Sequence, residues 1–337
     1  MESKSTITRT AYPRAALIGN PSDGYYGKTI AFVFSNYKAQ ASITADNKIS
    51  FIGNLQDADA YSSLESFNFH INRYGYYGGI RLLKATLRVF LKYCREHNEQ
   101  LMSGGFKLSY ESDIPIRLGL AGSSAIITAV LKALCSFYEV SIPMEVLPNL
   151  VLSVEKNELR IMGGLQDRVA QVYNRPIMMS FEKAHMDHYG YGIYEPLETG
   201  LICNTFIAYD QSGAEGSEIV HNNLKERFAS GDPMVIEAMQ QFVKLTDDFI
   251  TALRRKNIEV AKQCINDNFD LRRSICDIAS KQEHLVELIR LSGASAKFTG
   301  SGGAVIGMYE SEEELSRLRA KISNTGIQLI IPTIVNE

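Results

Sequence analysis

The chain has 337 residues, 45% of them hydrophobic, which suffices for a large core and fits two domains better than one. At a net charge of −3, the chain does not have the excess of basic residues that is typical of nucleic-acid-binding proteins, and no apolar run is long enough to span a membrane. We therefore expect that it binds neither nucleic acid nor a membrane. The five cysteines are scattered without metal-binding spacing and the N-terminus is polar, which together predict a reduced, cytoplasmic protein.

The first 97 residues are predicted to contain strands, one long loop and helices. The alternating stretch Thr6–Ile18 indicates a first strand, and the β-branched and aromatic stretch Thr29–Thr44 indicates another. Between them, residues 19–27 are dense in Gly, Pro, Asn and Asp, a composition typical of functional loops. A short helix is predicted over residues 57–69, and apolar side chains at helical spacing predict an amphipathic helix over Gly78–His97.

A loop of small residues runs straight into an apolar helix within Ile114–Leu134. The first amides of a helix have no intrahelical partner, and its dipole places partial positive charge at the loop. Since glycines let the backbone approach an anion closely, the loop is a candidate phosphate site. The residues concerned are Gly119, Leu120, Ala121, Gly122, Ser123, Ser124 and Ala125. The serine hydroxyls can cap the helix or bind a metal ion, and the residues alone leave both roles open.

Strands and helices alternate irregularly through the rest of the chain. Helices are predicted over Met144–Asn157 and Leu165–Val172, a strand over Pro176–Phe181, and a loop that crosses between domains over His185–Pro196. The elements predicted after this loop are strands at Leu201–Tyr209, on both sides of a loop within Ser295–Tyr309 and at Ile327–Ile331, and helices at 217–228, Pro233–Arg254, Ile258–Asn266, Leu285–Leu291 and Glu312–Ile322. Without a regular βαβ repeat, this order favours an α+β fold.

A second glycine loop, with Gly300, Ser301, Gly302 and Gly303, lies between two strand-like runs. No helix follows it, so it lacks the context of a dinucleotide-binding loop. The residues leave two alternatives open, which are a glycine hairpin without a binding role and a second close approach of the backbone to the same phosphates.

Further residues offer the other groups that phosphoryl transfer from ATP requires. The reaction needs Mg²⁺ ligands, a cation over the transferred phosphoryl group and a carboxylate near the acceptor hydroxyl. Glu155 and Glu158 lie on one predicted helix, Asp167 lies on the next, and Arg14 precedes the first loop. Most carboxylates on helices are solvated, so the spacing of these residues does not by itself make them a site.

Three motifs resemble those of the GHMP kinase superfamily, which includes galactokinase, homoserine kinase and mevalonate kinase. They are Pro13-Arg14 through Gly19-Asn20-Pro21-Ser22-Asp23, then Pro115–Ala125, then Lys297–Ala304. Within the superfamily the chain is most similar to plant-type glucuronokinases, through the stretches 76–83, 163–173, 268–274 and 293–305. Asn20-Pro21-Ser22 departs from the Glu-His-Thr of galactokinases, which alters recognition of a neutral hexose there. Ala121-Gly122 departs from the usual Gly-x of the phosphate loop.

The resemblance implies two α+β domains and the cofactors ATP and Mg²⁺. Residues 1–195 would form an N-terminal ATP-binding domain similar to the second domain of ribosomal protein S5. Residues 196–337 would form a ferredoxin-like C-terminal domain. The amides of Leu120–Ala125 would bind the phosphates, and Gly300–Gly303 would brace that loop.

The resemblance also implies catalytic roles. Asp167 would be the catalytic base, and Arg14 would reduce the negative charge on the acceptor oxygen and on the transferred phosphoryl group. Ser124 and Glu155 would hold Mg²⁺, which bridges the β- and γ-phosphates.

The implied reaction is phosphorylation of the anomeric hydroxyl of D-glucuronate by ATP, giving glucuronate 1-phosphate and ADP, in a monomer or a homodimer. Asp23 would hydrogen-bond the sugar hydroxyls, and the substrate carboxylate requires a cation. The candidate cations are Arg168, Arg272 and Arg273, with Arg117 and Lys28 also near the implied site. Because neighbours on a helix face different ways, only one of Arg272 and Arg273 fits that role.

Two alternatives to this reaction remain. A GHMP kinase for another sugar or a heptose phosphate would need changes in only a few loop residues. A non-catalytic sugar sensor would have an incomplete catalytic set, whereas Arg14, Ser124, Glu155 and Asp167 are all present.

Overall fold

The computed structural model describes residues 5–53, 57, 78–210 and 218–337. It divides into two compact units, each built from separate stretches of the chain. The first unit consists of Met1–Tyr12, Tyr37–Ile114 and Gly122–Gly163, and the second of Pro13–Asn36, Pro115–Ala121 and Gly164–Glu337. The predicted domain boundary between residues 195 and 196 follows from the family resemblance, whereas the two units are defined by contacts within the structure. The boundary stays a prediction.

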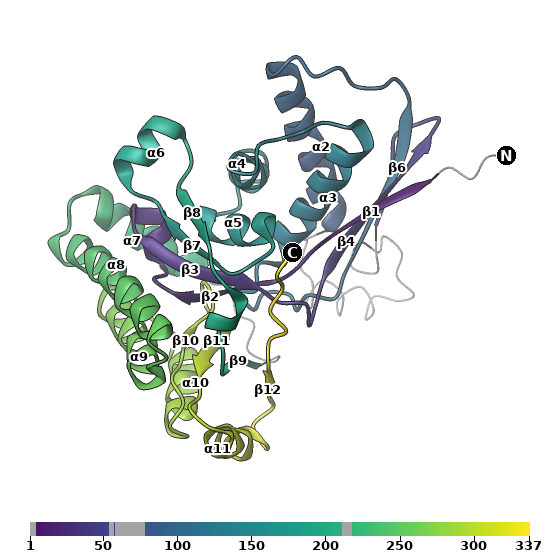
Figure 1. Ribbon diagram of the computed structural model, residues 1–337. Helices are drawn as coiled ribbons and strands as arrows, with labels where there is room; N and C mark the ends of the chain where they lie inside the picture. Colours follow the sequence, from purple (N-terminus) through teal and green to yellow (C-terminus); the bar gives the residue numbers. More distant parts are fainter. Residues whose placement is uncertain (1–4, 54–56, 58–77, 211–217) are drawn as a thin grey trace. The chain divides into compact units, whose positions relative to one another are not determined.

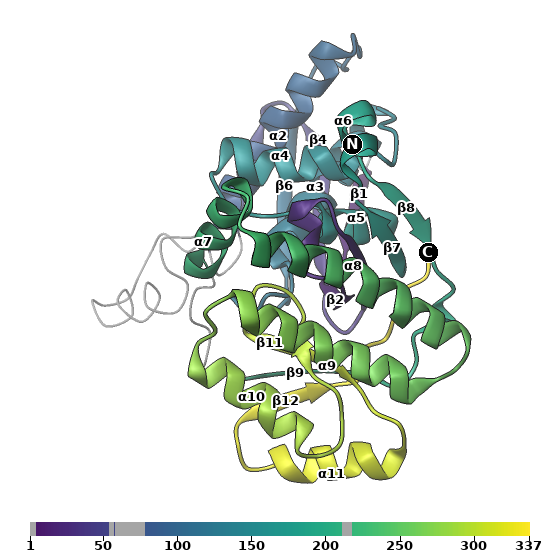
Figure 2. The ribbon, with the colours of Figure 1, turned by 90° about the vertical axis from the view of Figure 1, so that its left-hand side faces the viewer.

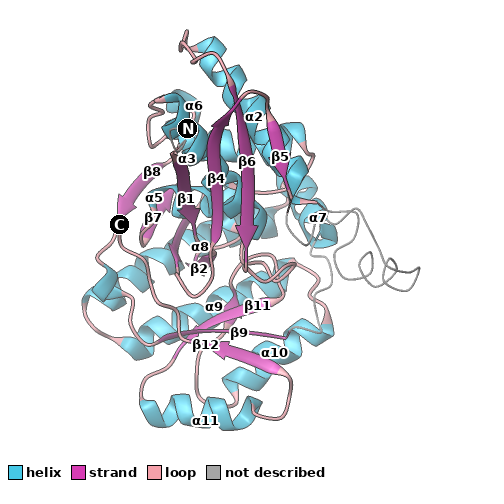
Figure 3. Ribbon diagram, turned by 90° about the vertical axis from the view of Figure 1, so that its right-hand side faces the viewer, coloured by secondary structure: helices cyan, strands magenta, loops and turns pink. Residues whose placement is uncertain are grey.

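The first unit contains a four-stranded sheet with the order β1–β4–β6–β5, whose long strands β4 and β6 lie side by side (Figure 3). Its strands are β1 (Thr6–Ala11), β4 (Ala39–Asp46), β5 (Ser50–Ile52) and β6 (Gly105–Ser112). Neighbouring strands are antiparallel, except that β5 pairs with β6 in parallel. Buried Ala39, Ala41 and Ile43 alternate with more exposed residues along β4, which indicates a sheet with one covered face.

Helices cover this sheet. They are α2 (Gly79–Glu96), α3 (Gly122–Tyr138), α4 (Leu147–Ser153) and a π-helical turn (Val154–Glu158). Helix α3 packs against β1 and β4, and α2 packs against α3. Because α3 is covered on several sides, it is apolar around most of its circumference, as a buried helix should be. The helix predicted over Met144–Asn157 is shorter and ends in the π-helical turn, a feature that often occurs at functional sites.

The second unit contains two four-stranded antiparallel sheets. The first has the order β2–β3–β7–β8 and consists of β2 (Arg14–Ile18), β3 (Lys28–Val33), β7 (Ile177–Ser180) and β8 (Ile193–Pro196). The second has the order β10–β11–β9–β12 and consists of β9 (Thr205–Asp210), β10 (Lys297–Phe298), β11 (Ala304–Met308) and β12 (Ile327–Ile330).

Seven α-helices are described in the second unit. They are α5 (Leu165–Tyr173), α6 (Lys183–Tyr189), α7 (Glu218–Ala229), α8 (Pro233–Arg254), α9 (Ile258–Ile275), α10 (Ser280–Arg290) and α11 (Glu312–Ile322). Helices α8 and α9 lie side by side (Figure 1). Helices α9, α10 and α11 pack on the sheet that contains β9 (Figure 2), and their core includes Phe206, Phe269, Val286 and Leu318. This core fixes the position of α9, which carries Arg272.

Several sequence predictions were wrong about where elements end. The strand predicted over Thr6–Ile18 is two strands, because Pro13 lacks an amide hydrogen and the chain leaves the first unit there. The stretch Thr29–Thr44 is likewise two strands, separated where the chain re-enters the first unit. The predicted loop at His185–Pro196 instead includes most of α6 and all of β8.

Two further predictions concern length and membrane spans. Helix α9 continues nine residues beyond the predicted end at Asn266. The helix predicted over residues 57–69 lies outside the described residues, apart from Asp57. Among the residues that the structure describes, none of the helices combines the length and the apolarity needed to cross a membrane.

Candidate functional site

The second unit brings the two predicted glycine loops into contact. Gly119 has a φ of +68°, and a Cβ atom there would lie 2.5 Å from the carbonyl oxygen of Gly302. In return, a Cβ atom at Gly300 would lie 2.7 Å from the carbonyl oxygen of Gly119. The Thr299 hydroxyl also donates to the Gly119 carbonyl at 3.4 Å. Only glycine leaves room for this approach, so the requirement for glycine at these positions is steric.

In the first unit, the start of α3 carries a hydroxyl that contacts a buried carboxylate. Ser123 Oγ donates to Glu155 Oε1 at 2.7 Å, and Glu155 is fully buried in the π-helical turn. Ser124, which the resemblance pairs with Glu155, is buried next to Ser123 at the start of the same helix. These hard oxygen atoms suit Mg²⁺, which usually takes one or two carboxylates together with phosphate oxygens. The described residues contain no group of three His, Cys, Asp or Glu that could hold a metal ion.

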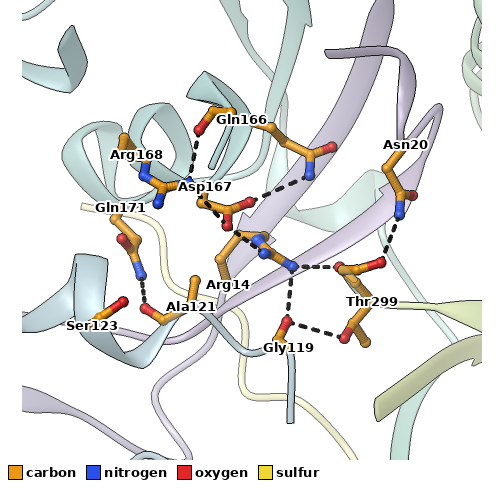
Figure 4. Close-up of polar contacts among 12 residues, drawn as sticks. Arg14, Asn20, Gly119, Ala121, Ser123, Gln166, Asp167, Arg168, Gln171 and Thr299 are labelled. Atoms are coloured by element: carbon orange, nitrogen blue, oxygen red, sulfur yellow. Dashed lines mark hydrogen bonds and ion pairs between the residues drawn. The ribbon is translucent and has the colours of Figure 1, made fainter. Parts of the chain in front are cut away.

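Arg14 and Asp167, the two predicted catalytic residues, form an ion pair in the second unit (Figure 4). Arg14 lies on β2 and Asp167 in the first turn of α5, and their Nη2 and Oδ2 atoms are 2.7 Å apart. Arg14 Nη1 also donates to the carbonyl oxygens of Thr299 and Gly119. Arg14 is therefore fixed by both glycine loops while it contacts the carboxylate.

A second arginine completes the surroundings of Asp167. Arg168 Nη1 lies 3.3 Å from Asp167 Oδ2 and donates to the Gly164 carbonyl at 2.8 Å. Burial opposes ionisation of Asp167, but the positive charges of Arg14 and Arg168 outweigh it and lower the pKa of this carboxyl. Asp167 is therefore ionised throughout the neutral pH range.

Asp23, the predicted ligand of the sugar hydroxyls, belongs to the same group of charges. It lies in the 3₁₀ turn Ser22–Tyr25, and its carboxylate packs so closely on Gly164 that a Cβ atom there would collide with it. Burial and then the Asp167 carboxylate raise the pKa of Asp23 to about 6, against the opposing effect of Arg14 and Arg168. Two neighbouring carboxylates with pKa values shifted in opposite directions are typical of an active site.

The structure separates the predicted cations for the substrate carboxylate. Arg272 is buried, and it donates from Nη1 to the Gly300 carbonyl at 2.6 Å and from Nη2 to the Ser301 carbonyl at 3.1 Å. Arg273 faces another way, as expected, and pairs at the surface with Glu283. Lys28 pairs with Asp247. Arg168 is the predicted cation that adjoins both Asp23 and Asp167.

Sequence reasoning missed a buried lysine next to the second glycine loop. Lys297 is 1% exposed, and its Nζ donates to the carbonyls of Ala16 at 2.8 Å and Phe298 at 2.9 Å. Burial, together with the charges of Arg272 and Arg14, places the pKa of Lys297 well below its usual value. Its position between the small residues Ala294–Ala296 and the glycine loop is a weak signal, because a lysine usually lies at the surface.

Comparison with known proteins identifies the family of the chain. Residues 81–175 match the family model described as GHMP kinases N terminal domain, and residues 249–328 match that described as GHMP kinases C terminal. A protein of Arabidopsis thaliana named probable glucuronokinase 2 is 42% identical, over 88% of this chain and 82% of its own. Glucuronokinase 1 of the same plant is 36% identical, over 100% of this chain and 95% of its own.

A solved structure gives the same fold. The crystal structure of Lactococcus lactis galactokinase complexed with galactose matches with a TM-score of 0.74 at 14% sequence identity, over 98% of this chain and 94% of that one. The family resemblance read from the three motifs is confirmed, and the chain belongs to the GHMP kinases.

Proposed function

We propose that this kinase transfers the γ-phosphoryl group of ATP to the anomeric hydroxyl of D-glucuronate, forming glucuronate 1-phosphate and ADP. The observation that carries the chemistry is the ion pair between Arg14 and Asp167, whose arginine also contacts both glycine loops. The identity to two glucuronokinases over most of the chain supports the choice of substrate.

Asp167 acts on the hydroxyl of the sugar. Its ionised carboxylate accepts a hydrogen bond from the anomeric hydroxyl, orients it for attack and takes its proton as the new O–P bond forms. The lowered pKa makes Asp167 a weak base, so proton transfer comes late, when the attacking oxygen has become acidic. Arg14 stabilises the negative charge that develops on the acceptor oxygen and the phosphoryl group.

The phosphates are bound by backbone amides of the loop from Gly119 to Ala125. Glu155, with the hydroxyls of Ser123 and Ser124, would hold Mg²⁺, and their oxygen atoms suit this ion. When bound with ATP, the ion neutralises charge on the β- and γ-phosphates.

The sugar is recognised by the charged group around Asp23. The Asp23 carboxylate accepts hydrogen bonds from sugar hydroxyls, and Arg168 is the cation that receives the uronate carboxylate. The position of Arg168 near both Asp23 and Asp167 supports this assignment. Arg273 and Lys28 instead pair with carboxylates at the surface.

The test is ADP release with Mg-ATP over a panel of free sugars, uronic acids and sugar phosphates, for the wild type and Asp167→Asn. We expect turnover on glucuronate that Asp167→Asn reduces by about three orders of magnitude or more, since the base is removed. Turnover only on a neutral or phosphorylated sugar would overturn the substrate assignment and leave the catalytic residues. No turnover on any acceptor, with ATP still bound, would favour a sugar sensor.

A further inference from the structure

Four consecutive carbonyl groups in the second glycine loop accept hydrogen bonds from buried basic side chains. We name the carbonyls of residues 298–301 the carbonyl row. Their donors are Lys297 Nζ to Phe298, Arg14 Nη1 to Thr299, Arg272 Nη1 to Gly300 and Arg272 Nη2 to Ser301. A turn with this many glycines would otherwise adopt many conformations, so these donors select one of them.

Arg272 holds two members of the row at once. Its guanidinium spans the successive carbonyls of Gly300 and Ser301 as a fork and lies 5.2 Å from the ring centre of Phe298. Arg272 is only 3% exposed, and burial lowers its pKa. A cation buried to this degree requires acceptors of fixed geometry, and backbone carbonyls provide them here.

The turn that Arg272 holds is in contact with the first glycine loop. The Gly302 carbonyl oxygen lies so close to Gly119 that no Cβ atom would fit between them, and Gly303 packs in the same way against Leu118. A displacement of the turn toward Gly119 must therefore move the backbone there, immediately before the start of α3, and a displacement away from it would remove this support. The two hydrogen bonds from Arg272 to the turn therefore also support the position of the first glycine loop.

We propose that Arg272 is a positioning residue for the nucleotide, which keeps the turn of residues 300–303 against Gly119 and so keeps the phosphate loop in its binding conformation. The proposal rests on the proposed function, in which that loop binds the phosphates of ATP. It assigns Arg272 to the loop rather than to the sugar, because Nη1 and Nη2 each donate to a carbonyl oxygen of the turn.

The experiment compares Arg272→Met and Arg272→Lys with Arg273→Met as the matched control. Arg273 is the sequence neighbour, but it pairs with Glu283 at the surface and contacts neither glycine loop in the described chain. Titration calorimetry with Mg-ADP measures nucleotide binding without a sugar, and steady-state kinetics measures KM for ATP and for the sugar separately.

We expect Arg272→Met to weaken binding of Mg-ADP and raise KM for ATP by about 10- to 100-fold, the cost of a misplaced binding loop, with KM for the sugar unchanged. Arg272→Lys should lie between, since an ammonium group can hold one of the two carbonyls firmly. Arg273→Met should bind Mg-ADP like the wild type. A rise in KM for glucuronate alone would overturn the proposal and make Arg272 a sugar ligand.

Hydrogen exchange provides a second readout if Arg272→Met does not fold. In Arg272→Lys, the amides of Ala16 and Thr299, which donate to the carbonyls of Thr299 and Ala304, should exchange faster than in the wild type, and those of α11 should not change. Unchanged exchange and unchanged Mg-ADP binding in this variant would overturn the proposal. Failure of the glucuronate assignment would leave the Mg-ADP result intact, so the two failures are distinguishable.

Discussion

Replacing Asp23 with asparagine should stabilise the protein at neutral and alkaline pH and weaken sugar binding. Burial, and next the Asp167 carboxylate, raise the pKa of Asp23 from 3.8 to about 6. The folded protein therefore binds this proton more tightly than the unfolded chain, and ionisation of Asp23 reduces stability as the pH rises. Asparagine has the shape of the protonated carboxyl group and does not ionise, so Asp23→Asn removes this cost.

The two pKa values of Asp23 set the size of the effect. At about 1.36 kcal/mol per unit, the shift from 3.8 to about 6 corresponds to a gain of up to about 3 kcal/mol in the free energy of unfolding at about pH 8. Below pH 6 the folded wild type takes up the proton, so the gain decreases to about 1 kcal/mol near pH 4.5. The side chain is partly exposed, which makes these figures upper values.

Urea unfolding of the wild type and Asp23→Asn at both pH values measures the gain directly. The matched control is Asp187→Asn, at an exposed carboxylate on α6, which should change the free energy of unfolding by less than about 1 kcal/mol at either pH. Asp23→Asn should also lower kcat/KM for the sugar, because an amide cannot replace both acceptor oxygens of the carboxylate. The reasoning is refuted if Asp23→Asn is no more stable than the wild type at pH 8, or if its gain is the same at both pH values.

Three other substitutions test separate parts of the structure. Gly119→Ala should lower the melting temperature and weaken Mg-ADP binding, because its Cβ atom would collide with the Gly302 carbonyl oxygen. Melting curves with and without Mg-ADP measure both effects, and curves identical to those of the wild type would contradict the prediction. Glu155→Gln should raise the Mg²⁺ concentration needed for half-maximal activity at least about tenfold, measured at fixed ATP, and an unchanged titration would exclude Glu155 as a ligand. Glu314→Gln should lower the free energy of unfolding by about 3 kcal/mol, because it breaks the buried pair with Lys262, whose Nζ lies 2.7 Å from Oε1. Urea unfolding measures that loss, and kcat at 25 °C should be unaffected.

The sequence predicts best those elements whose ends are marked by local signals. Helices α8 and α11 have the predicted bounds. Helix α8 begins at Pro233 after a capping Asp232, and α11 follows Ser311, whose hydroxyl accepts a hydrogen bond from the amide of Glu314. Each of these signals involves residues within one turn of the helix end, so no tertiary information is needed.

Other features depend on contacts between distant residues, and local patterns do not contain them. The break between β1 and β2 requires knowing that the chain changes units at Pro13. The hydrogen-bond partners of Arg272 lie in a loop that begins 28 residues later in the sequence, at Gly300. The resemblance implies that Arg14 and Asp167 act together, but only the folded chain gives the contact of Arg14 with Thr299 and the opposite pKa shifts of Asp23 and Asp167.

The discontinuous composition of the two units has a consequence for how the chain reaches its native state. The chain passes from one unit to the other after Tyr12, Asn36, Ile114, Ala121 and Gly163, so neither unit consists of one continuous stretch. Arg14 bonds to Thr299, which lies 285 residues later in the sequence. Because such non-local contacts slow folding, a nascent chain interrupted before the second glycine loop would lack one of the acceptors that hold Arg14, the Thr299 carbonyl. A fragment that ends at Gly163 would therefore contain the whole first unit but only two short stretches of the second, so fragments of this chain could complement each other only by completing a shared unit.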